Sequence, residues 1–359
     1  MNRVHLKPIL QLVSLVALIV LGTVVSDRLS RESKPDFRAS VKWEQLTTKE
    51  SQESAPELVV HDHSRADGGY TLYPVSGTED VLLLDPNGQV AHRWKVDVGR
   101  TVLLPNCNLL AIHASKWGLK QPKWRALRDV IREYSWEGEI VWEYKAEDEV
   151  HHDLSRLPNG NTLFLQRSMV PDSVRAKIVD ESRRKNPIRS DRIVEVNSSR
   201  EIVWDWYAHD HLDINSCGKP GCERFVGSSE ARKKLSDWTH MNTVRRIPDN
   251  KWYRAGHSAF KPGNLLVIAR SWWSILGIDR ESKQVVWKYE GDHEGGLVRG
   301  HDAYMIPEGF PGAGNILVFD NGLEKLRPYS MILEINPISK KVVWSYKDED
   351  KFYSRASGS

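Results

Sequence analysis

One short pattern recurs five times along this chain and limits what it can fold into. Each copy is an apolar stretch with aromatic residues at its end, and the copies are VAHRW (90–94), IVWEY (140–144), IVWDW (202–206), VVWKY (285–289) and VVWSY (342–346). A polar or small-residue turn precedes each copy, and a further apolar alternation, such as MILEI (331–335), precedes the turn. Strand, turn and strand at a recurring interval are typical of a β-propeller blade or a β-solenoid unit.

A second repeated element opens the units. It reads LLPNCNLLAI (103–112), LPNGNTLFL (157–165), PGNLLVIA (262–269) and GAGNILVF (312–319). A turn of Pro, Gly and Asn between two apolar strands is typical of a hairpin. Insertions at 116–133, 170–190 and 207–237 interrupt the units, and we expect short helical turns in the first and third of them. Because propeller loops project from two faces and tolerate insertions better than a solenoid does, we predict an all-β propeller.

The N-terminus predicts export. An almost uncharged run at 9–25 follows a short basic start and precedes charged residues, which is the pattern of a signal peptide or a single membrane anchor. We favour an uncleaved anchor, with the rest of the chain outside the cytoplasm because positive charge precedes the run. The expected organisation is a signal or anchor helix at 1–26, a polar linker at 27–68, with one strand near 41–46, and a propeller domain at 69–359. The expected location is periplasmic or otherwise extracytoplasmic.

The three cysteines fit an exported protein. Cys217 and Cys222 flank a Gly-Lys-Pro-Gly turn, so we expect a local disulfide; the alternative, half of a metal site, lacks a second cysteine pair. Cys107 occupies the position that Gly160 fills in the parallel repeat, and we expect a buried free thiol there.

Charge and motifs exclude several other functions. A net charge of +3, without a dense basic face, gives no reason to propose nucleic-acid binding. The run at 209–213 (HDHLD) has residue types that bind metals, but consecutive side chains point in different directions, so a polar loop is the better interpretation. We expect neither a metal nor a cofactor.

The repeat register selects the candidate site. His152 and His301 each lie six residues before the proline of a turn, and Asn242 takes the same position in a third unit, with His240 two residues earlier. Because the start of a blade's innermost strand lines the propeller axis, these side chains should converge. Arg270 ends the apolar strand that follows the third of these units and should reach the same opening.

A histidine cluster beside an arginine suits the transfer of an anionic group. Imidazole can act as a nucleophile or as a general acid and base near neutral pH. Cationic and amide donors can stabilise charge on the oxygens of the transferred group. The alternative is that these histidines are only turn or cap residues. His151 is the weaker candidate, because the register selects His152.

At these residues the chain resembles the bacterial arylsulfate sulfotransferases over roughly residues 69–354. The motifs that carry the resemblance are HHDLSRLPNGNTL (151–163), THMNTVRRIP (239–248), VIARSWWSILGID (267–279), GHDAYMIP (300–307) and GNILVFDNG (314–322). The resemblance implies a six-bladed propeller, of which 352–359 would open an incomplete last blade. It also implies a sulfuryl transfer from a phenolic sulfate ester to a phenol without a nucleotide donor, by a ping-pong route through a sulfated histidine.

The resemblance assigns roles to the candidate residues. His301 would be the nucleophile, and the residues that hold the sulfuryl oxygens and assist the phenols would be His152, His240, Asn242 and Arg270, with His151 as a further substrate-binding candidate. Consistent with this, the chain has no phosphate-cradling G-x-x-x-x-G-K-[ST] loop. Two rivals remain, a non-catalytic propeller that binds a protein or glycan partner and a quinone-dependent dehydrogenase.

Overall fold

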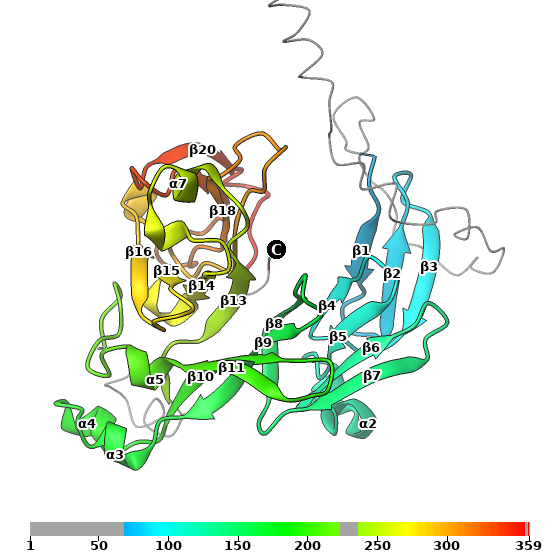
Figure 1. The fold of residues 1–359 in the computed structure, drawn as a ribbon, viewed down its shortest axis with the longest axis horizontal. Coiled ribbons are helices and arrows are strands. Elements are labelled where there is room, and N and C mark those ends of the chain that lie inside the picture. Colours follow the sequence, from blue (N-terminus) through cyan, green and yellow to red (C-terminus); the bar gives the residue numbers. More distant parts are fainter. Residues whose placement is uncertain (1–67, 223–235, 356–357, 359) are drawn as a thin grey trace, which may run out of the picture. The chain divides into compact units, whose positions relative to one another are not determined.

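The computed structural model describes residues 68–222, 236–355 and 358. In these residues five antiparallel sheets follow one another along the chain as the blades of an all-β propeller (Figure 1). The predicted fold class is therefore confirmed, but the expectation of six blades is wrong. After the fifth blade the backbone turns, with the Phe352 N–H donating to the Asp348 carbonyl at 2.9 Å, and no strand is formed in 348–355.

The predicted N-terminal segments lie outside the described residues. This applies to the helix at 1–26, to the strand near 41–46 and to all but the last residue of the linker at 27–68. Within the described ranges, no helix is both long and apolar enough to cross a membrane.

Four blades have four main strands each, in sequence order from the inside outwards. The second blade consists of β4 (Arg100–Leu103), β5 (Leu109–Ile112), β6 (Val130–Tyr134) and β7 (Ile140–Lys145). The third consists of β8 (Val150–Arg156), β9 (Thr162–Met169), β10 (Ile188–Val196) and β11 (Ile202–Tyr207), with β12 (Ser236–Asp237) parallel to β10. The fourth consists of β13 (Met241–Arg246), β14 (Leu265–Ala269), β15 (Ser274–Ile278) and β16 (Val285–Tyr289). The fifth consists of β17 (Asp302–Met305), β18 (Ile316–Asp320), β19 (Met331–Ile335) and β20 (Val342–Lys347).

The first blade has three strands in the described residues, β1 (Thr71–Pro74), β2 (Asp80–Leu84) and β3 (Val90–Lys95). The pairing of Val81 with Trp94 corresponds to that of Ile131 with Tyr144 in the second blade. The three strands are therefore equivalent to the outer three of the other blades.

The hairpin turns of the repeat need a left-handed residue. It is the residue just before the asparagine of each turn, and its φ is 66° at Cys107, 85° at Gly160, 100° at Gly263 and 87° at Gly314. Cys107 thus takes the conformation of the glycine that it replaces, and its free thiol is half-buried rather than fully buried. The next residue is an asparagine, which in the second, third and fifth blades donates to a glutamate of that blade's third strand, as Asn108 does to Glu133 at 2.7 Å.

Tryptophans of the outermost strands join successive blades. Buried apolar clusters lie between neighbouring sheets, and the indole N–H crosses each of these interfaces to a carbonyl in the strand turn of the next blade. The donors and acceptors are Trp94 and Ser135 (3.0 Å), Trp142 and Ser198 (3.2 Å), Trp204 and Arg280 (3.0 Å), Trp206 and Lys283 (2.9 Å), and Trp287 and Pro337 (2.9 Å). The recurring aromatic residues are therefore an architectural element.

In the part of the chain that the structure describes, no further blade covers the equivalent aromatic positions of the fifth blade. Tyr346 is 46% exposed, whereas its counterparts are nearly covered, at 7% for Tyr144, 1% for Trp206 and 3% for Tyr289. Trp344 is 50% exposed, and its indole has no hydrogen-bond partner among the described residues.

The insertions contain short helices. The first holds a 3₁₀ turn, η2 (Gly118–Lys120), and α2 (Pro122–Arg125), and the second holds α3 (Asp172–Arg175) and α4 (Glu181–Arg184). The third begins with α5 (Ala208–His211) and contains a disulfide between Cys217 and Cys222. Its expected helical turn at 228–235 lies outside the described residues. The remaining short helices are α7 (Lys251–Arg254), η4 (Ser258–Phe260), η5 (Arg270–Trp272) and η6 (His293–Gly295).

Four charged residues tie the innermost strands of the second to fifth blades together. Arg100 on β4 lies 3.5 Å from Asp153 on β8 and 3.4 Å from Asp302 on β17. Arg245 on β13 lies 2.8 Å from Asp153 and 3.6 Å from Asp302. We call these four residues the axial ion network. Burial raises the pKa of Asp153, and the two arginines oppose that rise.

Replacing Trp287 by Ala should destabilise the protein by about 3–5 kcal/mol, because a buried aromatic side chain and its interblade hydrogen bond are lost together. The matched change Trp344→Ala should cost about 1 kcal/mol or less, since that side chain is half exposed. Urea unfolding of both variants measures the difference. Equal decreases in the free energy of unfolding would contradict the assignment of Trp287 as an interblade contact.

Candidate active site

The backbone is irregular where the candidate residues lie. The pairing register of β8 shifts between His151 and Leu154, and that of β13 shifts between Met241 and Thr243. Left-handed backbone occurs at His152 (φ 57°), His240 (φ 48°) and Arg299 (φ 61°). Bulges of this kind redirect side chains, and strained residues of this kind concentrate at functional sites.

The structure brings three of the predicted histidines together. The ring centroid of His152 lies 4.9 Å from that of His240 and 6.3 Å from that of His301. The three residues come from three blades, at the start of β8, just before β13 and just before β17. The convergence arises because β8 lies next to β13 and β13 lies next to β17.

Arg270 and Asn242 adjoin this histidine cluster. Arg270 begins η5 directly after β14, and its backbone N–H donates to the His240 carbonyl at 3.2 Å. Its side chain is half-buried and forms no hydrogen bond or ion pair with the part of the chain that the structure describes. Asn242 is buried, donates from Nδ2 to the Gly300 carbonyl at 3.2 Å, and has an Oδ1 atom with no donor among the described residues.

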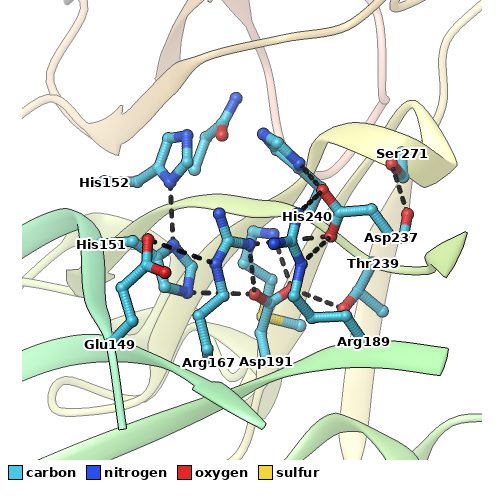
Figure 2. Close-up of polar contacts among 12 residues, drawn as sticks. Glu149, His151, His152, Arg167, Arg189, Asp191, Asp237, Thr239, His240 and Ser271 are labelled. Atoms are coloured by element: carbon cyan, nitrogen blue, oxygen red, sulfur yellow. Dashed lines mark hydrogen bonds and ion pairs between the residues drawn. The ribbon is translucent and has the colours of Figure 1, made fainter. Parts of the chain in front are cut away.

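His151 lies behind the cluster and connects it to a buried carboxylate. Its Nε2 is 3.1 Å from Asp191 Oδ1, and its Nδ1 is 2.8 Å from the Nδ1 of His152 (Figure 2). The negative charge of Asp191 beside Nε2 favours the His151 tautomer with its hydrogen on Nε2, in which Nδ1 accepts from His152. His152 is left with Nε2 as its basic nitrogen. Burial and neighbouring cationic groups hold the pKa of His152 well below its usual range, so it is neutral at pH 7.

His240 is paired with a second carboxylate. Its Nδ1 contacts Asp237 Oδ2, and Arg189 donates to the same carboxylate at 2.8 Å (Figure 2). Burial alone would raise the pKa of Asp237, but the hydrogen bonds from His240 and Arg189 and the charge of Arg167 hold it well below its usual range. Asp237 is therefore a carboxylate that orients His240 through Nδ1.

Arg167 lies between the two carboxylates that support the cluster. Its Nη1 is 3.7 Å from Asp191 and 3.6 Å from Asp237. Asp191 also accepts from Thr239 Oγ1 at 2.5 Å and from the Met241 N–H at 2.8 Å. This layer supports the histidines by buried ion pairs and by charge-assisted hydrogen bonds, which are stronger than neutral ones.

His301 has a neutral partner instead. Its Nδ1 lies 2.7 Å from Asn321 Oδ1, and its backbone N–H donates to the Phe319 carbonyl at 2.9 Å. Burial lowers the pKa of His301 to about 4, and the charge of His240 adds to this, while the hydrogen bond to Asn321 opposes it. At neutral pH His301 is therefore a neutral imidazole with Nδ1–H and a lone pair on Nε2.

Sequence reasoning missed the supporting residues. Asp237 lies three residues before His240, and Asn321 belongs to the FDNG motif, so both had a detectable local signal. Arg167 and Asp191 had none: they face each other only through the pairing of β9 with β10. Arg189 meets Asp237 in the same way, through the pairing of β10 with β12.

The arrangement suits the transfer of an anionic group. It combines two neutral imidazoles with basic Nε2 atoms, a third imidazole paired with a carboxylate, and a guanidinium that has no counter-ion among the residues described. Among the described residues, no group of three or more His, Cys, Asp or Glu side chains is placed to hold a metal ion.

Comparison with known families identifies the class. The family model for arylsulfotransferase (ASST) matches residues 45–296. This is more than half of the 359 residues, and the chain belongs to the arylsulfotransferase family. Membership supports an arylsulfotransferase activity, acting on small aryl substrates, at the level of the family. The match contains His152, His240, Asn242 and Arg270, whereas His301 lies beyond its end.

Solved structures resemble the chain more weakly. A Bacteroides caccae protein of unknown function is 13% identical, with 78% of this chain and 94% of that chain covered and a TM-score of 0.36. BamB from Moraxella catarrhalis is 15% identical, with 68% of this chain and 47% of that chain covered and a TM-score of 0.32. A putative exported protein of Bacteroides fragilis is 8% identical, with 77% and 68% covered and a TM-score of 0.36. At these scores none carries an argument about this chain. No curated protein matches it.

Titration of His301 in the folded protein should give a pKa of about 4, and in the urea-unfolded chain a value near the ordinary ~6.5. Because the unfolded chain then binds a proton that the folded chain does not, His301 makes stability fall as pH drops from ~6.5 towards 4. NMR of the imidazole carbon-bound protons, assigned with a His301→Gln variant, measures both values. A folded-state pKa near 6.5 would contradict the burial of His301.

Proposed function

We propose that this protein is an arylsulfate sulfotransferase that works by a ping-pong route with His301 as the nucleophile. The observation that carries the proposal is the state of His301. Its Nδ1 is bonded to an amide oxygen and its pKa is lowered to about 4, so Nε2 is unprotonated at neutral pH. Membership in the arylsulfotransferase family supports the substrate class, a phenolic sulfate donor and a phenol acceptor.

In the first half-reaction, Nε2 of His301 attacks the sulfur of the aryl sulfate. The N–S bond forms as the bond between sulfur and the phenolic oxygen breaks. The leaving oxygen takes a proton from the His240 ring, which Asp237 orients through Nδ1. His301 then carries the sulfuryl group, and His240 is neutral.

In the second half-reaction, an acceptor phenol occupies the place of the released one. Its oxygen attacks the sulfur while its proton passes to the neutral His240, and the N–S bond breaks. Protons and charges therefore return to their starting state. His152, whose ring lies close to that of His240, is the second candidate for accepting this proton.

The oxygens of the transferred group need positive charge around them. Arg270 suits this role, because its guanidinium has no counter-ion among the described residues and its backbone is hydrogen-bonded to His240. Arg167 and Arg189 are less suited, since both already neutralise Asp237. Asn242 has one amide N–H engaged by Gly300, which leaves the other for substrate.

We also propose that the protein acts outside the cytoplasm. The disulfide between Cys217 and Cys222 supports this, because disulfides persist mainly in oxidising compartments. The apolar run at 9–25 supports it independently, as a signal peptide or as a membrane anchor.

A donor–acceptor assay tests the activity. Purified residues 27–359 should release p-nitrophenol from p-nitrophenyl sulfate faster when phenol is added, and His301→Ala should lower the rate by about 10³-fold or more. His257→Ala, at an exposed histidine outside the cluster, is the matched control and should keep the rate.

No acceptor-dependent release from folded protein would contradict the proposal and favour a non-catalytic binding propeller instead. Retained activity in folded His301→Ala would contradict the choice of nucleophile.

Replacing Asp237 by Asn should slow sulfuryl transfer most from donors whose phenolate is a poor leaving group. The variant keeps the size of the side chain but removes the negative charge beside His240. General acid catalysis contributes about 10²–10⁴-fold, and little of it is needed when the leaving phenolate is stable. The rate with phenyl sulfate should therefore fall about 10²-fold more than the rate with p-nitrophenyl sulfate. Equal losses with both donors would show that Asp237 has no part in proton transfer.

A further inference from the structure

Asn321 is held in one orientation by a segment that follows the fifth blade. It lies directly after β18 and is fully buried. Its Nδ2 donates to the carbonyl of Ser354 at 2.7 Å, and its Oδ1 faces His301 Nδ1 at 2.7 Å. A carbonyl can only accept, so the amide atom that faces Ser354 must be the NH₂ group. The amide oxygen must then face His301, and the His301 nitrogen opposite it must carry the proton.

The segment 352–354, which we call the C-terminal strap, is fixed by Ser330. The Ser330 N–H donates to the Phe352 carbonyl at 2.7 Å, and the Ser354 N–H donates to Ser330 Oγ at 2.8 Å. Ser330 Oγ in turn donates to the backbone carbonyl of Asn321 at 3.0 Å. These bonds form a closed network around the amide that faces His301.

Aromatic packing holds the strap against the fifth blade. The ring of Phe352 meets Phe319 edge-on at 5.6 Å and Tyr346 at 5.3 Å between centroids. Phe319 belongs to β18, and its carbonyl accepts the backbone N–H of His301. The strap, Asn321 and His301 are therefore parts of one packed unit.

We propose that Asn321 is the positioning residue that selects the reactive tautomer of His301, and that the C-terminal strap sets the orientation of Asn321. The inference rests on the proposed function for its catalytic consequence. A neutral imidazole without such a partner populates both tautomers, and in one of them Nε2 carries the proton and cannot attack sulfur. An amide suits this position better than a carboxylate, since it fixes Nδ1–H without placing a negative charge beside the ring.

The tautomer can be measured without any sulfate transfer. In protein with ¹⁵N-labelled histidine at neutral pH, Nδ1 of His301 should give the signal of a protonated nitrogen and Nε2 that of an unprotonated one. Asn321→Ala should mix the two forms, and Asn336→Ala, in a surface turn of the same blade, should leave them unchanged. Asn321→Asp should keep Nδ1–H but raise the pKa of His301, because it places a negative charge beside the ring.

Activity provides the second readout. Single-turnover transfer from p-nitrophenyl sulfate should fall about 10- to 100-fold in Asn321→Ala. Phe352→Ala, which loosens the strap without touching His301, should shift the same tautomer signals and lower the rate in the same direction. In Asn321→Asp the low-pH side of the rate profile should move to higher pH.

Two results would overturn the inference. One is an unchanged His301 tautomer in folded Asn321→Ala. The other is an unchanged His301 pKa in Asn321→Asp. If the tautomer and pKa respond as expected but no variant and no parent protein transfers sulfate, the positioning role stands and the proposed function fails.

Discussion

The axial ion network is the interaction on which the site depends most. Arg100 and Arg245 each bridge Asp153 and Asp302, so four innermost strands from four blades share one set of alternating charges. Removing one partner from a buried ion pair costs about 3–5 kcal/mol, because the remaining charge stays desolvated. Asp153 follows His152 and Asp302 follows His301 in the chain. The network therefore anchors the chain directly after two of the three histidines.

The site has two layers with different tasks. The inner layer presents basic imidazole nitrogens and one guanidinium, and the outer layer decides which nitrogen of each imidazole carries a proton. Asp191 acts on His152 through His151, Asp237 acts directly on His240, and Asn321 acts on His301. In the mechanism that we propose, carboxylates support the histidines that move protons, whereas a neutral amide supports the one that attacks. This division gives each histidine a different chemistry in the same small volume.

The repeat made much of the fold predictable, and counting from the turn proline placed His152, Asn242 and His301 in one register. The three side chains share this spacing to the proline although their inner strands begin at different distances from it, at Val150, Met241 and Asp302. The five copies of the aromatic pattern match the five blades, whereas the wrong expectation of six came from the family resemblance. Arg167 and Asp191 could not be predicted from the sequence either, because only sheet pairing brings them to the cluster. The relation of Asn321 to the strap depends on packing between Phe352 and the fifth blade, which has no local sequence signal.

The covalent intermediate is the central claim, and mapping it by mass spectrometry is the most direct test. The protein would be incubated with p-nitrophenyl sulfate without acceptor, stopped under alkaline conditions that preserve a sulfated imidazole, digested and sequenced by fragmentation. The account predicts one added sulfuryl group on the peptide that contains His301, lost when phenol is supplied before the digest. A chain that stays unmodified while it transfers sulfate, or a sulfuryl group on His152 or His240 with none on His301, would contradict it.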